Sequence, residues 1–221
     1  MGQAYSIPPG ATVLDFARFL GNVRTGDVIL FSGRGFFSSF IRCGSLGKNW
    51  SHVGVVVVET DASGTRTPFL IDSNTPVGLH DFASGRDDKS GPQMVNLAQR
   101  IIQYDGYFVA ARYLDPSVES EELREAWRAS LVSYVKSLPV SAKYDTNPAD
   151  FWGASMRANV DGTPNYYCTE FAAAALQHAG IIEAPIPCEN YTLDDFRFRI
   201  PTRAGLRYGE PAYLELGWYK L

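Results

Sequence analysis

The chain has 221 residues and a mass of 24.4 kDa, which suits one domain, residues 1–221, with a substantial core. Its 45% hydrophobic and 20% charged residues are typical of a globular protein without repeats or low-complexity segments. A net charge of −4 and a pI near 5.4 give no general attraction to polyanions, so we expect no nucleic-acid partner.

The cysteine content argues against a metal site. Cys43, Cys168 and Cys188 show none of the C-x-x-C spacing that zinc sites and redox pairs use, so we expect no metal and no other cofactor. The sequence has neither the pattern of a secretory leader nor an apolar run long enough to span a bilayer. We therefore expect a cytoplasmic protein.

One short motif qualifies that expectation. Residues 1–6 read M-G-Q-A-Y-S and match the pattern for myristoylation at Gly2, although so short a pattern also arises by chance. One acyl chain gives only weak, reversible membrane contact. The sequence thus allows at most a peripheral membrane association.

In chain order, the first half predicts a packing helix, then strands. Apolar spacing favours helices over residues 11–21 and 36–43, and a buried strand over residues 28–31. Residues 53–58 are continuously apolar and β-branched, which indicates a strand covered on both faces. After a hairpin-like loop, residues 68–71 form the returning strand, which ends at Asp72.

This hairpin brings two polar residues together. His52 stands at the start of the first strand and Asp72 at the end of the second. Because these positions are neighbours in an antiparallel pair, we expect the carboxylate to lie beside the imidazole and to support its charged form. Alone, each residue would be interpreted as structural. Their pairing favours a functional interpretation.

Downstream, a polar excursion at the surface is predicted over residues 77–93. Strands follow at residues 94–97 and 108–114, with a short helix at 98–103 between them. Residues 120–137 form an amphipathic helix whose stripe of Leu123, Trp127, Leu131 and Val135 is expected in the core. A last strand is predicted at residues 213–218.

Cys168 opens the most informative helix. Four alanines follow it at residues 172–175, and Gly180 ends the pattern. A thiol in the first turn of a helix lies at the positive end of the helix dipole, which favours the nucleophilic thiolate. The alternative is a small buried cysteine without chemistry.

Three histidines are available to activate this cysteine. His178 lies ten residues further along the same helix, about 15 Å away, and is excluded. His80 lies in a polar loop beside Asp81 and is a poor candidate for fixed positioning. His52, on a rigid strand with Asp72 beside it, is the predicted partner.

These motifs resemble the papain-like superfamily in its circularly permuted, NlpC-like branch, in which histidine precedes cysteine. The resemblance covers about residues 24–182, with an N-terminal helix before it and an extension after it. It rests on residues 26–31 (GDVILF), 51–56 (SHVGVV), 71–73 (IDS), 143–145 (KYD) and 167–171 (YCTEF).

The resemblance implies an α+β fold, with an antiparallel sheet packed against the cysteine-bearing helix. It also implies a hydrolase or acyltransferase that acts on an amide, ester or thioester of a peptide or lipid through an acyl-enzyme on Cys168. His52 would be the base and Asp72 the third residue.

Two positions depart from the family pattern. Members more often carry glutamate at the third position, so Ser73 or Asn74 is an alternative to the shorter Asp72 for orienting His52. Threonine also replaces the usual serine after the cysteine. Glu170 matches a recurrent glutamate for which we expect a structural role in the first helical turn.

Several groups are candidates for binding the oxyanion. The N–H of Cys168 is a natural donor at the start of its helix, and Tyr144 and Tyr166 are candidate further donors or substrate-binding groups.

Two other functions remain open. The first is a lipid-acting enzyme that resembles lecithin:retinol acyltransferases, which the phenylalanines of residues 36–40 would suit. Its relatives carry glutamate and histidine directly after the cysteine, unlike Thr169 and Glu170 here. The second is a catalytically silent binding module of the same fold.

Overall fold

The structure is a computed structural model that describes residues 6–34, 49–115, 120–147, 153, 156, 165–184 and 186–216. Gly2, Cys43, the helix predicted at residues 36–43 and the end of the last predicted strand lie outside these residues. In chain order the elements are α1 (Phe16–Asn22), β1 (Val28–Gly33), β2 (His52–Thr60), β3 (Arg66–Asn74), β4 (His80–Asp81), β5 (Arg86–Asp87), β6 (Gly91–Asn96), α3 (Leu97–Gln103), β7 (Gly106–Arg112), α4 (Glu121–Ser137), α6 (Cys168–His178), the 3-10 turn η2 (Cys188–Asn190), α7 (Leu193–Phe198) and β8 (Ala212–Glu215).

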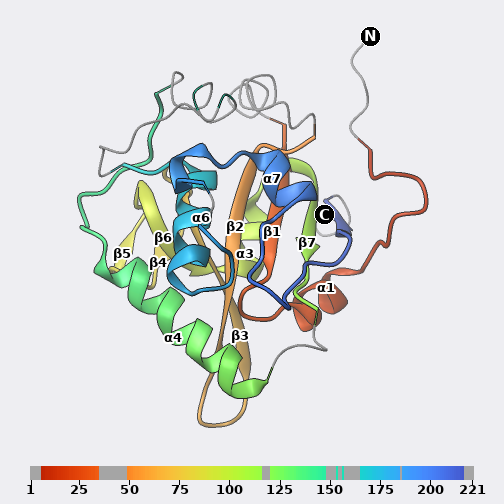
Figure 1. Cartoon of the computed structure of the whole chain (residues 1–221), viewed down its shortest axis with the longest axis horizontal. Coiled ribbons are helices and arrows are strands. Elements are labelled where there is room, and N and C mark those ends of the chain that lie inside the picture. The colour runs from red at the N-terminus through yellow and green to blue at the C-terminus, as the bar shows by residue number, and fades with distance from the viewer. Residues whose placement is uncertain are drawn as a thin grey trace.

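A six-stranded sheet in the order β6-β3-β2-β1-β7-β8 forms the centre of the molecule (Figure 1). Every neighbouring pair of its strands is antiparallel. The short strands β4 and β5 form a separate hairpin. The expected α+β class with an antiparallel sheet is therefore confirmed.

The central strands are covered on both faces, as their continuous apolar runs predict. Side chains from alternate positions pack on α4 and α6 on one face, and on α1 and α3 on the other (Figure 1). The buried residues on the α6 side include Leu30, Val53, Val55, Ile71, Trp127, Leu131, Phe171 and Leu176, and those on the α3 side include Phe19, Ile29, Phe31, Val56, Leu70, Val95 and Ile101.

The alanines of α6 let this helix lie close to the sheet. Ala172, Ala173 and Ala175 are fully buried, and α6 contacts β2 and β3. Because alanine combines the highest helix propensity with a minimal side chain, the same residues form the helix and permit the close approach. This packing holds Cys168 against the sheet.

The stripe predicted on α4 is wrong at one position. Leu123 is 38% exposed, whereas Arg124 is buried together with Trp127, Leu131 and Val135. A helix advances about 100° per residue, so positions four apart drift by about 40° at each step. Leu123 therefore rotates away from Val135, and Arg124 takes its place on the packed face.

The first predicted helix is shorter than expected. α1 begins at Phe16, where the Asp15 carboxylate accepts a hydrogen bond from the N–H of Arg18. The preceding residues are extended and pair with β8: the N–H of Leu14 donates to the Tyr213 carbonyl and the N–H of Tyr213 donates to the Thr12 carbonyl, each at 2.8 Å. This N-terminal segment thus covers the edge of β8.

The polar stretch 77–93 is only in part the surface excursion that its composition predicts. It contains the β4–β5 hairpin, yet Asp81 and Gln93 are fully buried and Lys89 is nearly so. The Asp81 carboxylate accepts hydrogen bonds from the N–H of Met94 and from the Ser84 hydroxyl, and Lys89 Nζ lies 3.5 Å from it. Asp81 and Lys89 are tolerated in the interior because each has polar partners.

Candidate active site

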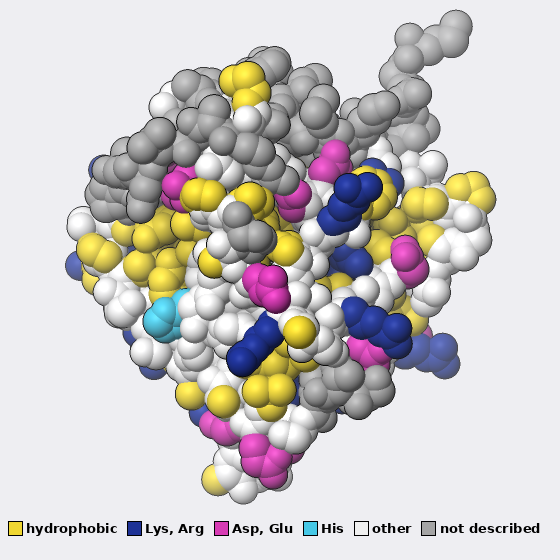
Figure 2. Space-filling model, viewed as in Figure 1, with side chains coloured by type: hydrophobic (Ala, Val, Ile, Leu, Met, Phe, Trp, Pro, Cys, Tyr) yellow, Lys and Arg dark blue, Asp and Glu magenta, His cyan; other side chains and the backbone are white. Residues whose placement is uncertain are grey.

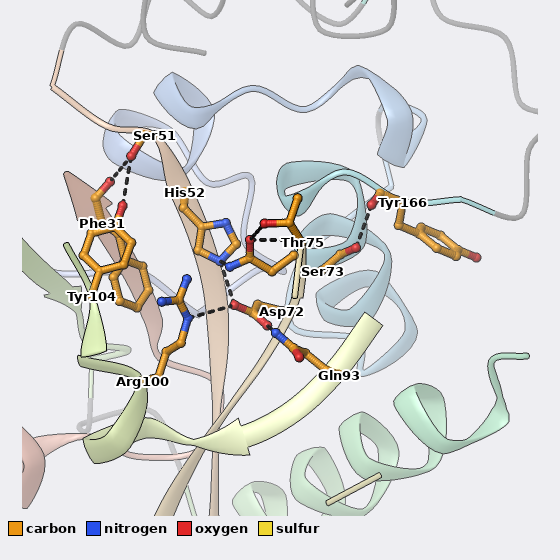
Figure 3. A network of polar contacts seen from close by, with 11 residues as sticks. Phe31, Ser51, His52, Asp72, Ser73, Thr75, Gln93, Arg100, Tyr104 and Tyr166 are labelled. Carbon is orange, nitrogen blue, oxygen red and sulfur yellow. Dashed lines mark hydrogen bonds and ion pairs between the residues drawn. The ribbon is translucent and has the colours of Figure 1, made fainter. Parts of the chain in front are cut away.

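The β2–β3 pair brings His52 and Asp72 together as the antiparallel argument predicts. Their side chains meet with His52 Nε2 2.7 Å from Asp72 Oδ2, and both residues are buried (Figure 3). The register pairs Val55 with Ile71, so His52 and Asp72 project from the same face of the sheet.

Two further side chains hold the Asp72 carboxylate. Gln93 on β6 donates from Nε2 to Oδ1 at 2.9 Å, and Arg100 on α3 places Nε 3.7 Å from Oδ2 (Figure 3). Burial by itself would raise the pKa of Asp72. The hydrogen bond and charge of His52, together with Arg100 and Gln93, outweigh burial and hold this pKa below its usual value. Asp72 is therefore a carboxylate at neutral pH.

Arg100 is itself enclosed by aromatic rings. Its guanidinium carbon lies 5.3 Å from the ring centroid of Phe31 and 5.0 Å from that of Tyr104, and the residue is only 4% exposed. The same Phe31 ring lies 5.5 Å from the His52 ring. Cation–π contact compensates part of the cost of burying this charge, so the cation is fixed next to Asp72.

Cys168 is the first residue of α6, as predicted. The backbone N–H of Tyr167 donates to the Glu170 carboxylate at 3.4 Å, and the Tyr167 hydroxyl donates to the Glu189 carbonyl of η2. Glu170 thus occupies the structural place in the first turn that we expected for it. These contacts fix the turn that carries the thiol at the positive end of the helix dipole.

His52 and Cys168 meet at the end of the sheet. The alternation of the strand directs His52 toward the α3 side, whereas Cys168 belongs to the cluster on the α6 side. Contact is possible because His52 is the first residue of β2. Burial by itself would lower the pKa of His52, but hydrogen bonds to Asp72 and Cys168 and the charges of both raise it to about 9.

Of the two candidate tyrosines, only Tyr144 is placed at the thiol. Burial, and then the charge of Cys168 and a hydrogen bond to it, raise the pKa of Tyr144 well above its usual value. Its hydroxyl therefore stays protonated and able to donate. Tyr166 instead packs its ring on Phe171 at 6.0 Å and shares a hydrogen bond with Tyr134.

A close backbone approach positions Tyr144. The segment 143–145 pairs with Tyr166 just before α6 and also lies against Gly91 of β6. Gly91 has φ +99°, and a Cβ there would overlap the carbonyl oxygen of Ala142. Only glycine fits this conformation and spacing.

The neighbours of Asp72 on β3 have other partners. The Ser73 hydroxyl donates to the Tyr166 carbonyl at 2.6 Å, which ties β3 to the residue two positions before Cys168 (Figure 3). Asn74 Nδ2 lies 3.5 Å from His52 Nε2, a long contact. Of the three residues considered for orienting His52, Asp72 makes the short contact.

The other histidines lie elsewhere, in agreement with the geometric argument. His178 ends α6 and packs on Tyr134, with the two ring centroids 5.0 Å apart. His80 lies on β4, where Nδ1 is 2.8 Å from Asp87 Oδ1.

The sequence interpretation missed Gln93 and Arg100. The sequence pattern places Gln93 in a polar excursion and Arg100 in a short helix, and neither position indicates a role at the site. One signal was available for Gln93: the antiparallel order that places β6 beside β3 sets it opposite Asp72 in the register. Arg100 had no such signal, because its burial depends on how α3 packs on the sheet.

In the described part of the chain, no three His, Cys, Asp or Glu side chains come together as a metal site would need. Nor does any described helix combine the length and apolar character needed to cross a bilayer.

Comparisons with known proteins add little to this picture. No family model matches the chain, and no curated protein matches it. Among solved structures, the chain is similar to the crystal structure of metalloprotein yiiX (DUF1105) from Escherichia coli O157:H7, with 17% identity and a TM-score of 0.46 over 86% of this chain and 87% of that one.

Proposed function

We propose that the chain is a cysteine hydrolase or acyltransferase with a permuted papain-like fold, acting on an amide, ester or thioester. One observation carries the proposal: His52 contacts the Asp72 carboxylate through Nε2 at 2.7 Å, and it lies close enough to Cys168, the first residue of α6, for the thiol to raise its pKa. A thiol, a base and a residue that orients the base form the arrangement that activates a nucleophile.

The first half-reaction uses this pair in its charged form. With a pKa of about 9, His52 is protonated at neutral pH and can stabilise a Cys168 thiolate. The sulfur attacks the substrate carbonyl carbon and forms a C–S bond. The π electron pair of the C=O bond moves onto the oxygen. As the tetrahedral intermediate collapses, His52 gives its proton to the leaving amine, alcohol or thiol, and an acyl-enzyme thioester remains on Cys168.

The second half-reaction restores the enzyme. His52, now neutral, takes a proton from water or another acceptor, whose oxygen attacks the thioester carbonyl. Collapse of this intermediate breaks the C–S bond and releases the acid or transferred product. The sulfur leaves as thiolate beside the protonated His52. In both steps the N–H of Cys168 and the Tyr144 hydroxyl are the nearest donors proposed for the oxyanion.

Thiol reactivity tests the proposal without knowledge of the substrate. Iodoacetamide should label Cys168 rapidly at neutral pH, and His52→Ala should slow the labelling. Cys188 is an internal control, because burial and then the hydrogen bond to Glu189 raise its pKa to about 12. Labelling of Cys168 that is no faster than labelling of Cys188 contradicts the proposal.

Turnover gives the second readout. A panel of aryl amides, esters and thioesters identifies the bond that is cleaved, and Cys168→Ser should abolish the activity while the fold remains intact by circular dichroism. Undiminished turnover in Cys168→Ser would exclude an acyl-enzyme on this residue.

One observation favours the alternative of a non-catalytic binding module. Cys168 is only 1% exposed, which is also what a structural cysteine shows. The two functions differ in the response to His52→Ala: a structural cysteine keeps the same slow labelling, whereas an activated one loses its rapid labelling.

A further inference from the structure

A second site lies at the opposite end of β2. A hollow of about 610 Å³ is bounded by the turn before β1, the β2–β3 hairpin and the first two turns of α4. Figure 1 places the start of β2 and the β2–β3 turn at opposite ends of the sheet. Eight residues separate His52 from Thr60, about 25 Å along an extended strand. The hollow is therefore distinct from the cysteine site.

Arginines from three different elements line this hollow. Arg24 comes from the turn before β1, Arg66 from the start of β3, and Arg124 from α4. Burial lowers the pKa of Arg124, the charge of Asp27 raises it, and the charges of Arg24 and Arg66 lower it further. The three guanidinium groups therefore repel one another. A cluster of like charges assembled from three segments costs free energy in the empty protein.

The nearby acidic residues offset this charge only in part. Three glutamates line the hollow beside four arginines, and two of them, Glu59 and Glu125, are engaged by Arg128 with contacts of 2.8 Å and 2.5 Å. The third is Glu121. Among the residues that the structure describes, no carboxylate lies within ion-pair distance of Arg24 or Arg66. Arg66 instead donates to the Val23 carbonyl at 3.0 Å, which satisfies a donor without neutralising its charge.

The buried Asp27 carboxyl behind the cluster is a weak counter-charge. Asp27 is 1% exposed, and burial raises its pKa to about 7. At neutral pH it is only about half ionised. Hydroxyl groups of Thr25 and Thr60 also line the hollow, and Thr25 Oγ1, which accepts from the Val58 N–H at 3.0 Å, still has its own proton to donate.

We propose that this hollow binds a phosphate monoester group through Arg24, Arg66 and Arg124. Guanidinium groups present planar pairs of donors that match phosphate oxygens. A tetrahedral dianion offers oxygens in several directions and so can meet donors from three elements, whereas a carboxylate has two oxygens in one plane.

The surface as a whole gives no general attraction for anions. On the face drawn in Figure 2, basic and acidic side chains are interspersed and form no field of one sign. The net charge of the chain is −4. Binding at this hollow must therefore come from the local arrangement of the arginines.

Calorimetric titration with inorganic phosphate at fixed ionic strength tests the site, with acetate as the comparison anion. Arg24 and Arg66 are exposed, so replacing either by methionine should leave the fold intact. We expect saturable phosphate binding, which each variant weakens by about tenfold. Arg66→Lys should retain part of the affinity, because it keeps the charge but loses the paired donors.

The matched control is Arg207→Met, since Arg207 pairs with Asp115 and does not line the hollow. It should bind phosphate like the unmodified protein. Phosphate heats no larger than those of acetate, or equal affinity in Arg24→Met, Arg66→Met and Arg207→Met, would overturn the proposal. Labelling of Cys168 is measured in the same variants and should not change, which separates this site from the proposed catalysis.

Two arms identify the source of the phosphate group. Binding of glycerol 3-phosphate, with no sedimentation on vesicles, assigns a free phosphate ester. Sedimentation with phosphatidylcholine vesicles that contain phosphatidic acid, lost in Arg66→Met, assigns a lipid headgroup. If neither glycerol 3-phosphate nor the vesicles that contain phosphatidic acid bind, the proposal is contradicted.

Discussion

The molecule contains two histidine–aspartate pairs of nearly equal length in very different surroundings. His52 and Asp72 lie 2.7 Å apart with side chains 7% and 0% exposed, whereas His80 and Asp87 lie 2.8 Å apart and are 45% and 86% exposed. The exposed pair is screened by the surrounding solvent and contributes little to stability. The buried pair has lost its hydration and depends on its neighbours to remain charged. Distance alone therefore does not identify a functional pair.

The largest difference should appear when each aspartate is replaced by asparagine. Asp72→Asn leaves Arg100 buried without its carboxylate and removes the charge that supports His52, so we expect a loss of about 3–5 kcal/mol in the free energy of unfolding. Asp87→Asn is the matched control and should cost less than about 1 kcal/mol. Urea denaturation at neutral pH measures both. Equal losses would show that burial does not distinguish the two pairs.

The pH dependence of stability isolates the buried imidazole. The folded-state pKa of His52 is raised from 6.5 to about 9. The contribution of protonated His52 to the free energy of unfolding is therefore fully present below about pH 6.5 and is lost as the pH rises through 9. The size of the pKa shift limits this loss of unfolding free energy to about 3 kcal/mol. Asp27, with a pKa of about 7, adds its own dependence at lower pH.

Urea denaturation between about pH 8 and 10 therefore separates His52 from Asp27. The stability of the unmodified protein should fall more steeply there than that of His52→Gln. Identical slopes would contradict the raised pKa of His52.

A smaller effect is expected from removing the buried cation. Arg100→Met deprives Asp72 of an ion pair at 3.7 Å but leaves its contacts with His52 and Gln93, so the loss should be about 1–3 kcal/mol. The pKa of Asp72 should rise. Since a lowered carboxyl pKa gives stability that is lost as pH falls through the folded-state value, acid unfolding should begin at a higher pH.

Arg18→Met is the control for this experiment, because Arg18 pairs with Asp15 at the surface at 3.4 Å. Its acid unfolding should match that of the unmodified protein. If Arg100→Met has the same acid-unfolding midpoint as the unmodified protein, Arg100 does not act on Asp72.

The smallest effect should come from Asn74→Ala. Its 3.5 Å contact with His52 is long for a hydrogen bond, so we expect a change below about 0.5 kcal/mol and an NMR-measured His52 pKa near its original value. A fall of that pKa as large as the fall in Asp72→Asn would assign the orienting role to Asn74.

The sequence placed the main parts of the site because they depend on local rules. The β-branched run at residues 53–58 identified β2, and the apolar segment 68–71 after the hairpin-like loop identified β3. Antiparallel order then brought His52 beside Asp72. The alanine run identified α6 with Cys168 at its start. Gly180, with φ +70°, lies just beyond the helix as its backbone freedom allows.

The features that the sequence did not provide depend on packing between distant segments. Arg100 and Gln93 are polar residue types that usually face water, and only the positions of α3 and β6 against β3 bury them. Leu123 is the converse case, an apolar residue that the rotation of α4 turns toward solvent. Residue type alone decides neither outcome.

The pairing of Thr12–Leu14 with Tyr213 sets a condition on when the sheet can be completed. β8 follows every other described strand in the chain, and its outer edge is covered by a segment that precedes all of them. On the ribosome, β1, β2 and β7 can pair before β8 emerges. The N-terminal segment must wait for β8, so synthesis itself delays the closure of this edge until β8 has emerged.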